Sequence, residues 1–337
     1  MGGRKKLQQE IFNLGIRARI DPRTVACSVD SEINGKSVKI SGFSQFPQTD
    51  AFIRNQAAEV FSELDITFDL KILSRSRPKF HQVTSSFVPF WKHPDDSKPE
   101  QLVTQALAGA VVRTYFPSGK YLYAQSTDGY LGYVPKSGLI PADENLYLRW
   151  KNGPCAILNN KIETGGMLLA PGTRLIFEKG RVVLPGGNSF RASGDQIRIS
   201  RPADPAYFRA VAALAKQFEG TPYLWGGKTE AGIDCSGFVQ TMALQMGILL
   251  PRDASMQANV GEYLGYLPDY ADLLPGDLMF FMNDKAYVFH VGIYAGKGRY
   301  LHSSGKLGVA YSDVAPGGKN YSDRYGGTFV FARRVHS

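Results

Sequence analysis

The stretch Gly232-Ile233-Asp234-Cys235-Ser236-Gly237-Phe238-Val239 places a cysteine where a glycine-rich loop gives way to an expected helix. Asp is a favoured N-cap residue, so Asp234 is expected to cap a helix that begins at Cys235. The positive end of such a helix lowers the pKa of a thiol in its first turn and favours the thiolate. Cys235 is therefore a candidate nucleophile, although the commonest fate of a lone cysteine is a buried structural thiol.

A nucleophilic cysteine needs a base and a group that orients the base. His290 lies in an expected strand, 287–294, that is apolar on both faces, where an unpaired polar ring costs about 1–3 kcal/mol. His302 follows on the next expected strand. Taken singly, each histidine also fits an ordinary core or surface position. Together with Cys235 they predict a papain-like arrangement in which Cys235 attacks a carbonyl, His290 is the base and His302 orients the imidazole.

Two further features of this arrangement concern the oxyanion and a metal. The backbone at Cys235 and Ser236, with the hydroxyl of Tyr223, is expected to hold the oxyanion. The rival interpretation is a zinc site formed by Cys235, His290 and His302, but no HExxH motif or paired CxxC accompanies these residues. The pattern favours a hydrolase that uses neither a metal nor a cofactor.

Six short blocks follow one another in the last part of the chain: Pro222-Tyr223-Leu224-Trp225-Gly226-Gly227, Asp234-Cys235-Ser236-Gly237, Pro251-Arg252-Asp253, Pro275-Gly276-Asp277-Leu278, His290-Val291-Gly292-Ile293-Tyr294 and Leu301-His302-Ser303. In this order they make residues 201–337 resemble the NlpC/p60 cysteine peptidases of bacterial cell-wall metabolism. The resemblance implies a papain-like fold with Cys235, His290 and His302 as the catalytic triad and Tyr223 beside the nucleophile.

The front of the chain is consistent with the subgroup of this family that carries bacterial Src-homology-3-like barrels before the peptidase. The resemblance implies a γ-D-glutamyl-L-diamino acid endopeptidase acting on murein peptides, with the first barrel restricting the cleft to short stems with a free amino end. It places these residues in the substrate pocket: Trp225, Asp234, Ser236, Arg252, Asp253, Tyr130 and Tyr133. Tyr130 and Tyr133 also fit ordinary barrel packing. Ala110 stands where relatives often have Glu, and Ala254 where they often have Ser, and both positions bear on the free-amine requirement.

The chain is expected to divide into four parts: a small α+β unit at 1–73, a first β-barrel at 74–145, a second β-barrel at 146–200 and an α+β peptidase domain at 201–337. In the first part, Leu7, Ile11, Leu14 and Ile16 form a helical stripe, and Asp50 is expected to cap a second helix. Strands are expected around 38–40 and 68–73.

The barrels are predicted from short alternating segments with glycine and proline turns. Asp128-Gly129, between the alternating segments 121–125 and 130–135, indicates a hairpin. The proline-rich stretch 201–205 indicates the boundary of the peptidase domain, and 207–218 has the pattern of an amphipathic helix.

Composition narrows the class of protein. The chain has 337 residues, 43% of them hydrophobic and 20% charged, which is a globular balance. Three cysteines without close spacing argue against a disulfide framework, and no apolar run is long enough for a membrane-spanning helix. Residues 1–23 lack an apolar signal core, so the chain is either cytoplasmic or the trimmed form of an exported protein.

Charge bears on the partner. The net charge is +9, of which residues 1–200 carry +8. This excess is either a solvated surface or an attraction to polyanions. The chain has no recognisable nucleic-acid-binding module, so anionic murein fragments are the expected partner. The expected oligomeric state is a monomer. Two other functions remain open: an N-acetylmuramoyl-L-alanine amidase and a non-catalytic protein that binds the cell wall.

Overall fold

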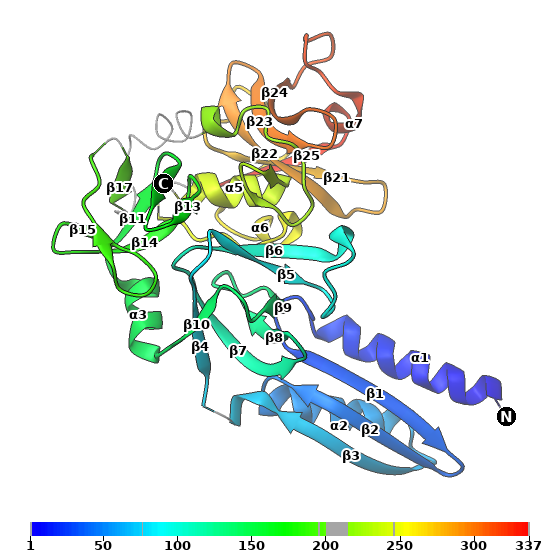
Figure 1. The fold of residues 1–337 in the computed structure, drawn as a ribbon. Helices are drawn as coiled ribbons and strands as arrows, with labels where there is room; N and C mark the ends of the chain where they lie inside the picture. The colour runs from blue at the N-terminus through cyan, green and yellow to red at the C-terminus, as the bar shows by residue number, and fades with distance from the viewer. Residues whose placement is uncertain (1, 76, 195, 200–214, 245–246, 336–337) are drawn as a thin grey trace.

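The structure is a computed structural model that describes residues 2–75, 77–194, 196–199, 215–244 and 247–335. An N-terminal unit of two helices and a small sheet lies beside a central sheet, and the last part of the chain covers the other end of that sheet (Figure 1). A further group of short strands lies between the central sheet and the C-terminal part in the sequence.

The N-terminal unit consists of α1 (Gly2–Arg19), β1 (Cys27–Asn34), β2 (Ser37–Ser44), α2 (Pro47–Val60) and β3 (Asp65–Ile72). β1 and β2 pair antiparallel, while β2 and β3 pair parallel, with α2 as the crossover between them. The apolar side chains between the helices and the sheet form a separate core. The two expected helices and two expected strands are present, and β1 is an additional strand.

The predicted apolar stripe of the first helix is wrong for three of its four residues and right for Ile16. Leu7, Ile11 and Leu14 are exposed, whereas Phe12 and Ile16 are buried against α2 and the sheet. The buried residues are four positions apart, which is one face of a helix, and the predicted set combined two faces. A helix that packs on one side only leaves the second apolar face in solvent.

Asp50 is not the cap of the second helix. Pro47 occupies the first turn and the cap position falls on Phe46, because proline is well suited to start a helix. Asp50 lies within the first turn, where it accepts a hydrogen bond from Arg54 Nε at 2.8 Å.

The central sheet has the strand order β10-β4-β7-β8-β9-β5-β6. Its members are β4 (Lys79–Val83), β5 (Phe87–Trp91), β6 (Leu102–Leu107), β7 (Val111–Ser118), β8 (Tyr121–Gln125), β9 (Leu131–Pro135) and β10 (Leu139–Ala142). The predicted hairpin is confirmed: Gln125 pairs with Leu131, and Asp128-Gly129 lies in the intervening loop. Gly129 has φ +88°, a conformation that favours glycine.

Residues 144–199 form helix α3 (Glu144–Asn152) and a second group of strands. These are β11 (Cys155–Leu158), β12 (Ile162–Thr164), β13 (Met167–Leu169), β14 (Arg174–Glu178), β15 (Arg181–Val183), β16 (Ser189–Phe190) and β17 (Ile197–Ile199). Five of them make the sheet β16-β15-β14-β11-β17, and β12 and β13 pair with each other. The arrangement of two barrels in series is not confirmed. The unpredicted α3 packs Trp150 into the core of the central sheet, so it lies across the expected boundary at residue 145.

The C-terminal part is built on a sheet with the order β20-β25-β21-β22-β23-β24. Its elements are β18 (Lys228–Thr229), β19 (Gly232–Ile233), α5 (Cys235–Leu244), α6 (Ala254–Gln257), β20 (Glu262–Tyr266), β21 (Leu278–Met282), β22 (Val288–Gly296), β23 (Arg299–Ser304), β24 (Gly308–Asp313), α7 (Asp323–Gly326) and β25 (Phe329–Arg334). α5 packs against β22 and β23, as expected for a mixed α+β unit.

Some expectations lie outside the described residues. They are the boundary at 201–205, residues 207–214 of the expected helix, and Met246; residues 215–218 are helical. Within the described part of the chain, no helix combines the length and the apolar character needed to cross a membrane.

Candidate active site

Cys235 is the first residue of α5, as the sequence predicts. Asp234 caps the helix: its Oδ1 accepts a hydrogen bond from the Gly237 N–H at 2.7 Å. The helix is almost entirely buried, and its packing against β22 brings Cys235 next to the strand that carries His290. The backbone N–H of Val291, the residue after His290, interacts with the thiol.

The two histidines lie on neighbouring strands and contact each other. His290 on β22 and His302 on β23 are both buried, and His290 Nε2 lies 2.7 Å from His302 Nδ1. His302 Nε2 in turn lies 2.9 Å from Ser312 Oγ on β24. The network is satisfied when His290 donates to His302 and His302 donates to Ser312, which leaves His290 Nδ1 without its proton. An imidazole in this tautomer can act as a base.

The packed structure opposes the thiolate that the helix position of Cys235 predicts. Burial raises the pKa of Cys235 to about 12, and nearby Asp234 adds to the shift. Burial also lowers the pKa of His290 well below its ordinary value, with His302 and Arg324 acting in the same direction. The loss of solvation at the buried thiol thus outweighs the effect of the helix dipole on its pKa. The sequence pattern did not reveal how deeply the thiol is buried. Both shifts favour the uncharged forms of the thiol and of the imidazole.

Two tyrosines flank the pair. Tyr223 is half-buried, and burial together with Cys235 raises the pKa of its hydroxyl. The ring of Tyr325 in α7 lies 4.3 Å from that of His290 and 5.0 Å from that of His302, centroid to centroid. Tyr325 was not predicted. It contributes a wall to the site, and its position after a poorly patterned loop offers no sequence signal.

A buried arginine holds the loop before the helix. Arg252 is only 1% exposed and makes two hydrogen bonds to Asp234, at 3.0 Å and 2.6 Å. It also donates to Ser236 Oγ at 2.9 Å and to Thr104 Oγ1 at 3.0 Å. Asp234, Ser236 and Arg252 were predicted as substrate-binding residues. They bind one another, so their visible role is to position Cys235 and to join it to β6.

The neighbouring Asp253 is only partly exposed, and it contacts two other parts of the chain. The Tyr130 hydroxyl donates to Asp253 Oδ2 at 3.3 Å, and Arg23 Nη1 donates to the same oxygen at 2.7 Å. Burial raises the pKa of Asp253 although Arg252 and Arg23 oppose it. Arg23, in the loop after α1, was not predicted as part of the site, because nothing in residues 1–73 marks it.

Tyr130, Tyr133 and Trp225 line one cavity. Its volume is about 870 Å³, and α1 and β1 of the N-terminal unit form its other wall. The Trp225 side chain is 61% exposed, which leaves its ring free to contact a ligand. Tyr133 also packs against Tyr123, with ring centroids 5.0 Å apart, so the packing role and the lining role coexist. Trp225 precedes Gly226, whose N–H donates to Asp234 Oδ2, and this links the cavity to the start of α5.

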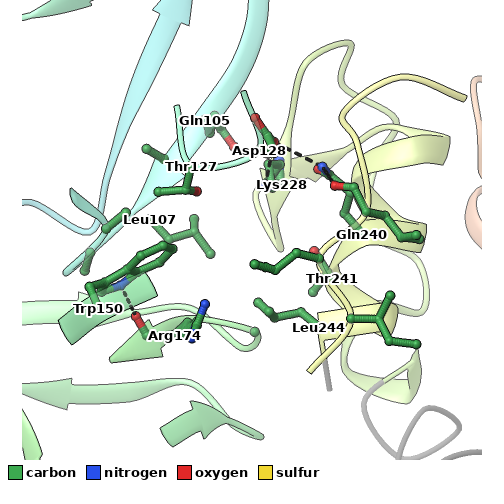
Figure 2. Close-up of a pocket in the computed structure, with 17 residues that line it drawn as sticks. Gln105, Leu107, Thr127, Asp128, Trp150, Arg174, Lys228, Gln240, Thr241 and Leu244 are labelled. Carbon is green, nitrogen blue, oxygen red and sulfur yellow. Dashed lines mark hydrogen bonds and ion pairs between the residues drawn. The ribbon is translucent and has the colours of Figure 1, made fainter. Parts of the chain in front are cut away.

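A second, smaller cavity of about 70 Å³ lies where β6, α3 and the later turns of α5 meet (Figure 2). Around it, Gln240 Nε2 donates to Asp128 Oδ2 at 3.1 Å, and Lys228 Nζ lies 3.7 Å from the same oxygen. The Lys228 N–H donates to Gln105 Oε1 at 2.7 Å. These contacts dock the loop of the β8–β9 hairpin and β6 on the helix that carries Cys235.

The site geometry does not favour the zinc interpretation. His290 Nε2 and His302 Nδ1 face each other at hydrogen-bond distance, so these two nitrogens are not free to share a metal. Among the residues that the structure describes, no three His, Cys, Asp or Glu side chains are grouped as metal ligands.

Comparison with known proteins identifies the family of the chain. The family model described as NlpC/P60 family matches residues 220–325, and that of the bacterial dipeptidyl-peptidase Sh3 domain matches residues 95–139. The "Probable endopeptidase NlpC" of Escherichia coli is 41% identical over 109 residues, which are 31% of this chain and 68% of that protein. The chain belongs to the NlpC/P60 family. This confirms the resemblance stated from the six sequence blocks.

Other NlpC/P60 relatives also match the front of the chain. A "Gamma-D-glutamyl-L-lysine dipeptidyl-peptidase" of Bacillus cereus is 29% identical over 228 residues, covering 60% of this chain and 67% of that protein. The crystal structure of an NlpC/P60 family protein from Bacillus cereus covers 77% of this chain and 100% of that one, with a TM-score of 0.63 and 24% identity. That structure shares the fold. The two family models together show an SH3-like domain before an NlpC/P60 domain. The residues matched by the SH3 model lie within the central sheet.

Proposed function

We propose that the protein is a cysteine endopeptidase that hydrolyses the γ-D-glutamyl–L-diamino acid bond of peptidoglycan stem peptides. The observation that carries the proposal is the chain of contacts from His290 through His302 to Ser312 beside a helix that begins with Cys235. Membership of the NlpC/P60 family supports the reaction class, and relatives named as γ-D-glutamyl-L-lysine dipeptidyl-peptidases support the bond.

The reaction begins with proton transfer. The Cys235 thiol gives its proton to His290 Nδ1 as the sulfur attacks the carbonyl carbon of the γ-glutamyl bond. The imidazolium formed is stabilised by its Nε2–H···His302 hydrogen bond. It then donates the proton to the departing amino group of the diamino acid. A thioester remains on Cys235, and water, deprotonated by His290, hydrolyses it. The oxyanion is held by the backbone at Cys235 and Ser236 and by the Tyr223 hydroxyl.

The test is product analysis by mass spectrometry with the purified full chain. Substrates are L-Ala-γ-D-Glu tripeptides that end in diaminopimelate or in lysine, and intact muropeptides. We expect release of the diamino acid side of the bond and its loss in Cys235→Ala. Cleavage between muramic acid and L-Ala would assign an amidase instead. If wild type cuts none of these substrates while Cys235→Ala protein binds insoluble sacculi, the protein is a wall-binding module and the proposal is wrong.

The proposal also includes the domain division, the oligomeric state and the site residues. We keep the division into four parts at 1–73, 74–145, 146–200 and 201–337, with the second boundary falling inside α3. We also keep a second SH3-like barrel at 146–200 and a monomer acting on murein fragments. Cys235, His290, His302 and Tyr223 are the proposed catalytic residues. Tyr130, Tyr133 and Trp225 are the proposed substrate contacts, since they line the large cavity. Asp253, predicted together with them, binds two residues that line this cavity, Tyr130 and Arg23.

A further inference from the structure

The N-terminal unit reaches the candidate site through one side chain. Arg23 Nη1 donates to Asp253 Oδ2 at 2.7 Å and to Ser255 Oγ at 3.3 Å, across 230 positions of sequence. The rest of the guanidinium is held by Asp21, which accepts from Nε and, at 2.7 Å, from Nη2. Arg23 is therefore fixed in orientation with one edge on Asp253.

The backbone around Arg23 is held as well. The Leu131 N–H donates to the Arg23 carbonyl at 2.7 Å, and Gln125 Nε2 donates to the Thr24 carbonyl at 3.1 Å. Both partners flank the loop that carries Tyr130, whose hydroxyl also binds Asp253. Displacing Arg23 from Asp253 thus requires breaking a set of contacts and not only moving a flexible side chain.

This pairing matters because the relatives of the chain are named for two modes of cleavage, endopeptidase and dipeptidyl-peptidase. A dipeptidyl-peptidase must recognise a free ammonium two residues before the scissile bond. A desolvated ammonium needs acceptors, best of all a carboxylate. Arg252 pairs with Asp234, and Arg23 pairs with Asp253, the residue after Arg252. Both carboxylates therefore already have a cationic partner.

The large cavity provides room for a substituent at that end of the substrate. Its volume of about 870 Å³ is in the range of sites that hold drug-sized ligands. Trp225 and Tyr133 offer aromatic surface, on which sugar rings commonly pack. Arg23 itself lines this cavity, together with residues of the β8–β9 hairpin and of α1.

We propose that Arg23 is a specificity-determining residue: by occupying Asp253 it lets the site take stem peptides with a substituted amino end, such as muramyl-linked peptides. The substituent lies in the cavity between Trp225 and the N-terminal unit. This inference rests on the proposed function and gives it the endopeptidase mode. It assigns the N-terminal unit, which lies outside both matched family models, a part in substrate selection.

The experiment compares kcat/KM for one tripeptide with a free amino end and for its N-acetylated form. We expect wild type to cut both, with values within about threefold of each other. Arg23→Ala frees Asp253 for an ammonium and should raise the free-to-acetylated ratio about tenfold, a size typical of one charge-assisted hydrogen bond. Arg23→Lys keeps the cation and should keep the wild-type ratio. Arg54→Ala, which removes a similar ion pair within the N-terminal unit, is the matched control and should not change the ratio.

Asp253→Asn provides a second measurement of the free-to-acetylated ratio, which is informative even if the Arg23 variants fail to fold. If Asp253 serves Arg23 and not the substrate, the free-to-acetylated ratio stays at the wild-type value. A wild type that cuts only the free peptide, or an Arg23→Ala ratio equal to that of wild type, overturns the role of Arg23 and leaves the proposed function intact. Failure of wild type to cut either peptide at the γ-glutamyl bond refutes the proposed function itself.

Discussion

His302 Nδ1 lies 2.7 Å from His290 Nε2, and the two rings are nearly perpendicular, with an interplanar angle of 86°. One histidine thus presents a lone pair to the N–H of the other. This contact sets which nitrogen of His290 is left to receive a proton, and the first prediction concerns it.

We expect His302→Ala to lower kcat by about 10²-fold with little change in KM, because the orienting acceptor acts on the base and not on the bound substrate. His302→Asn and His302→Gln retain an acceptor and should recover part of the loss. The measurement is steady-state cleavage of the tripeptide by each variant, with circular dichroism as the check on folding. Equal activity of His302→Ala and wild type would show that His302 has no role in catalysis.

The second prediction concerns stability in acid. Burial lowers the pKa of His302 to about 4, from 6.5 in the unfolded chain. As the pH falls through this window the unfolded chain takes up a proton that the folded protein does not, so the free energy of unfolding decreases and then levels off. Urea denaturation at about pH 7.5 and about pH 4.5 measures the decrease.

His302→Gln is the comparison for that measurement. It removes one titrating group, so its loss of stability between the two pH values should be smaller than that of wild type. His290 remains in both proteins and contributes in the same direction, since its pKa is also lowered by burial. An equal loss in the two proteins would contradict a buried, neutral His302.

The third prediction tests the buried ion pair beside the thiol. Arg252→Ala leaves Asp234 buried without its partner and should lower the free energy of unfolding by about 3–5 kcal/mol. Arg149→Ala is the matched control, because the Arg149–Glu178 pair is exposed on both sides and should cost less than about 1 kcal/mol. Urea denaturation of both variants provides the numbers, and similar costs would mean that Asp234 finds another partner.

The fourth prediction concerns the contact between the second group of strands and α5. Gly172 has φ +80°, and a Cβ there would lie 2.5 Å from Thr241 Cγ2. Gly180 has a similar φ of +73° with open space around it. Both Ala variants bear the cost of a left-handed backbone, about 1–2 kcal/mol, whereas Gly172→Ala adds about 1–3 kcal/mol for the overlap.

Comparing the melting temperatures of these two variants isolates the contact. Gly172→Ala should melt at a lower temperature than Gly180→Ala. If the two variants melt together, Thr241 moves away freely and the strands of residues 155–199 are not tightly docked on α5.

Local patterns predicted the elements that depend on neighbours in sequence. The Asp234 cap, the start of α5 at Cys235 and the β8–β9 hairpin are all present, because capping and turn conformations involve only a few consecutive residues. The stripe on α1 and the cap at Asp50 were wrong. In α1, several apolar positions were available and packing decided which of them are buried. In α2, Pro47 set the start of the helix ahead of Asp50.

Charge and protonation could not be predicted in this way. The helix position of Cys235 indicates a thiolate, but the pKa depends on burial by β22 and on Asp234, which are properties of the packed protein. Arg23, Tyr325 and Ser312 escaped prediction for the same reason, since their contacts with the site depend on how strands, helices and the N-terminal unit pack together.

The sequence by itself determined the family, through six blocks in order, and the candidate triad, because its spacing along helix and strands follows from local structure. Only the tertiary structure decided what each group contacts. It turned Arg252 and Asp234 toward each other, raised the pKa of the Cys235 thiol by burial, and brought Arg23 from the N-terminal unit to Asp253. Hydrogen bonds and solvation act over a few ångströms in space, and these distances are set by packing between segments that are 18 positions apart for Arg252 and Asp234 and 230 for Arg23 and Asp253.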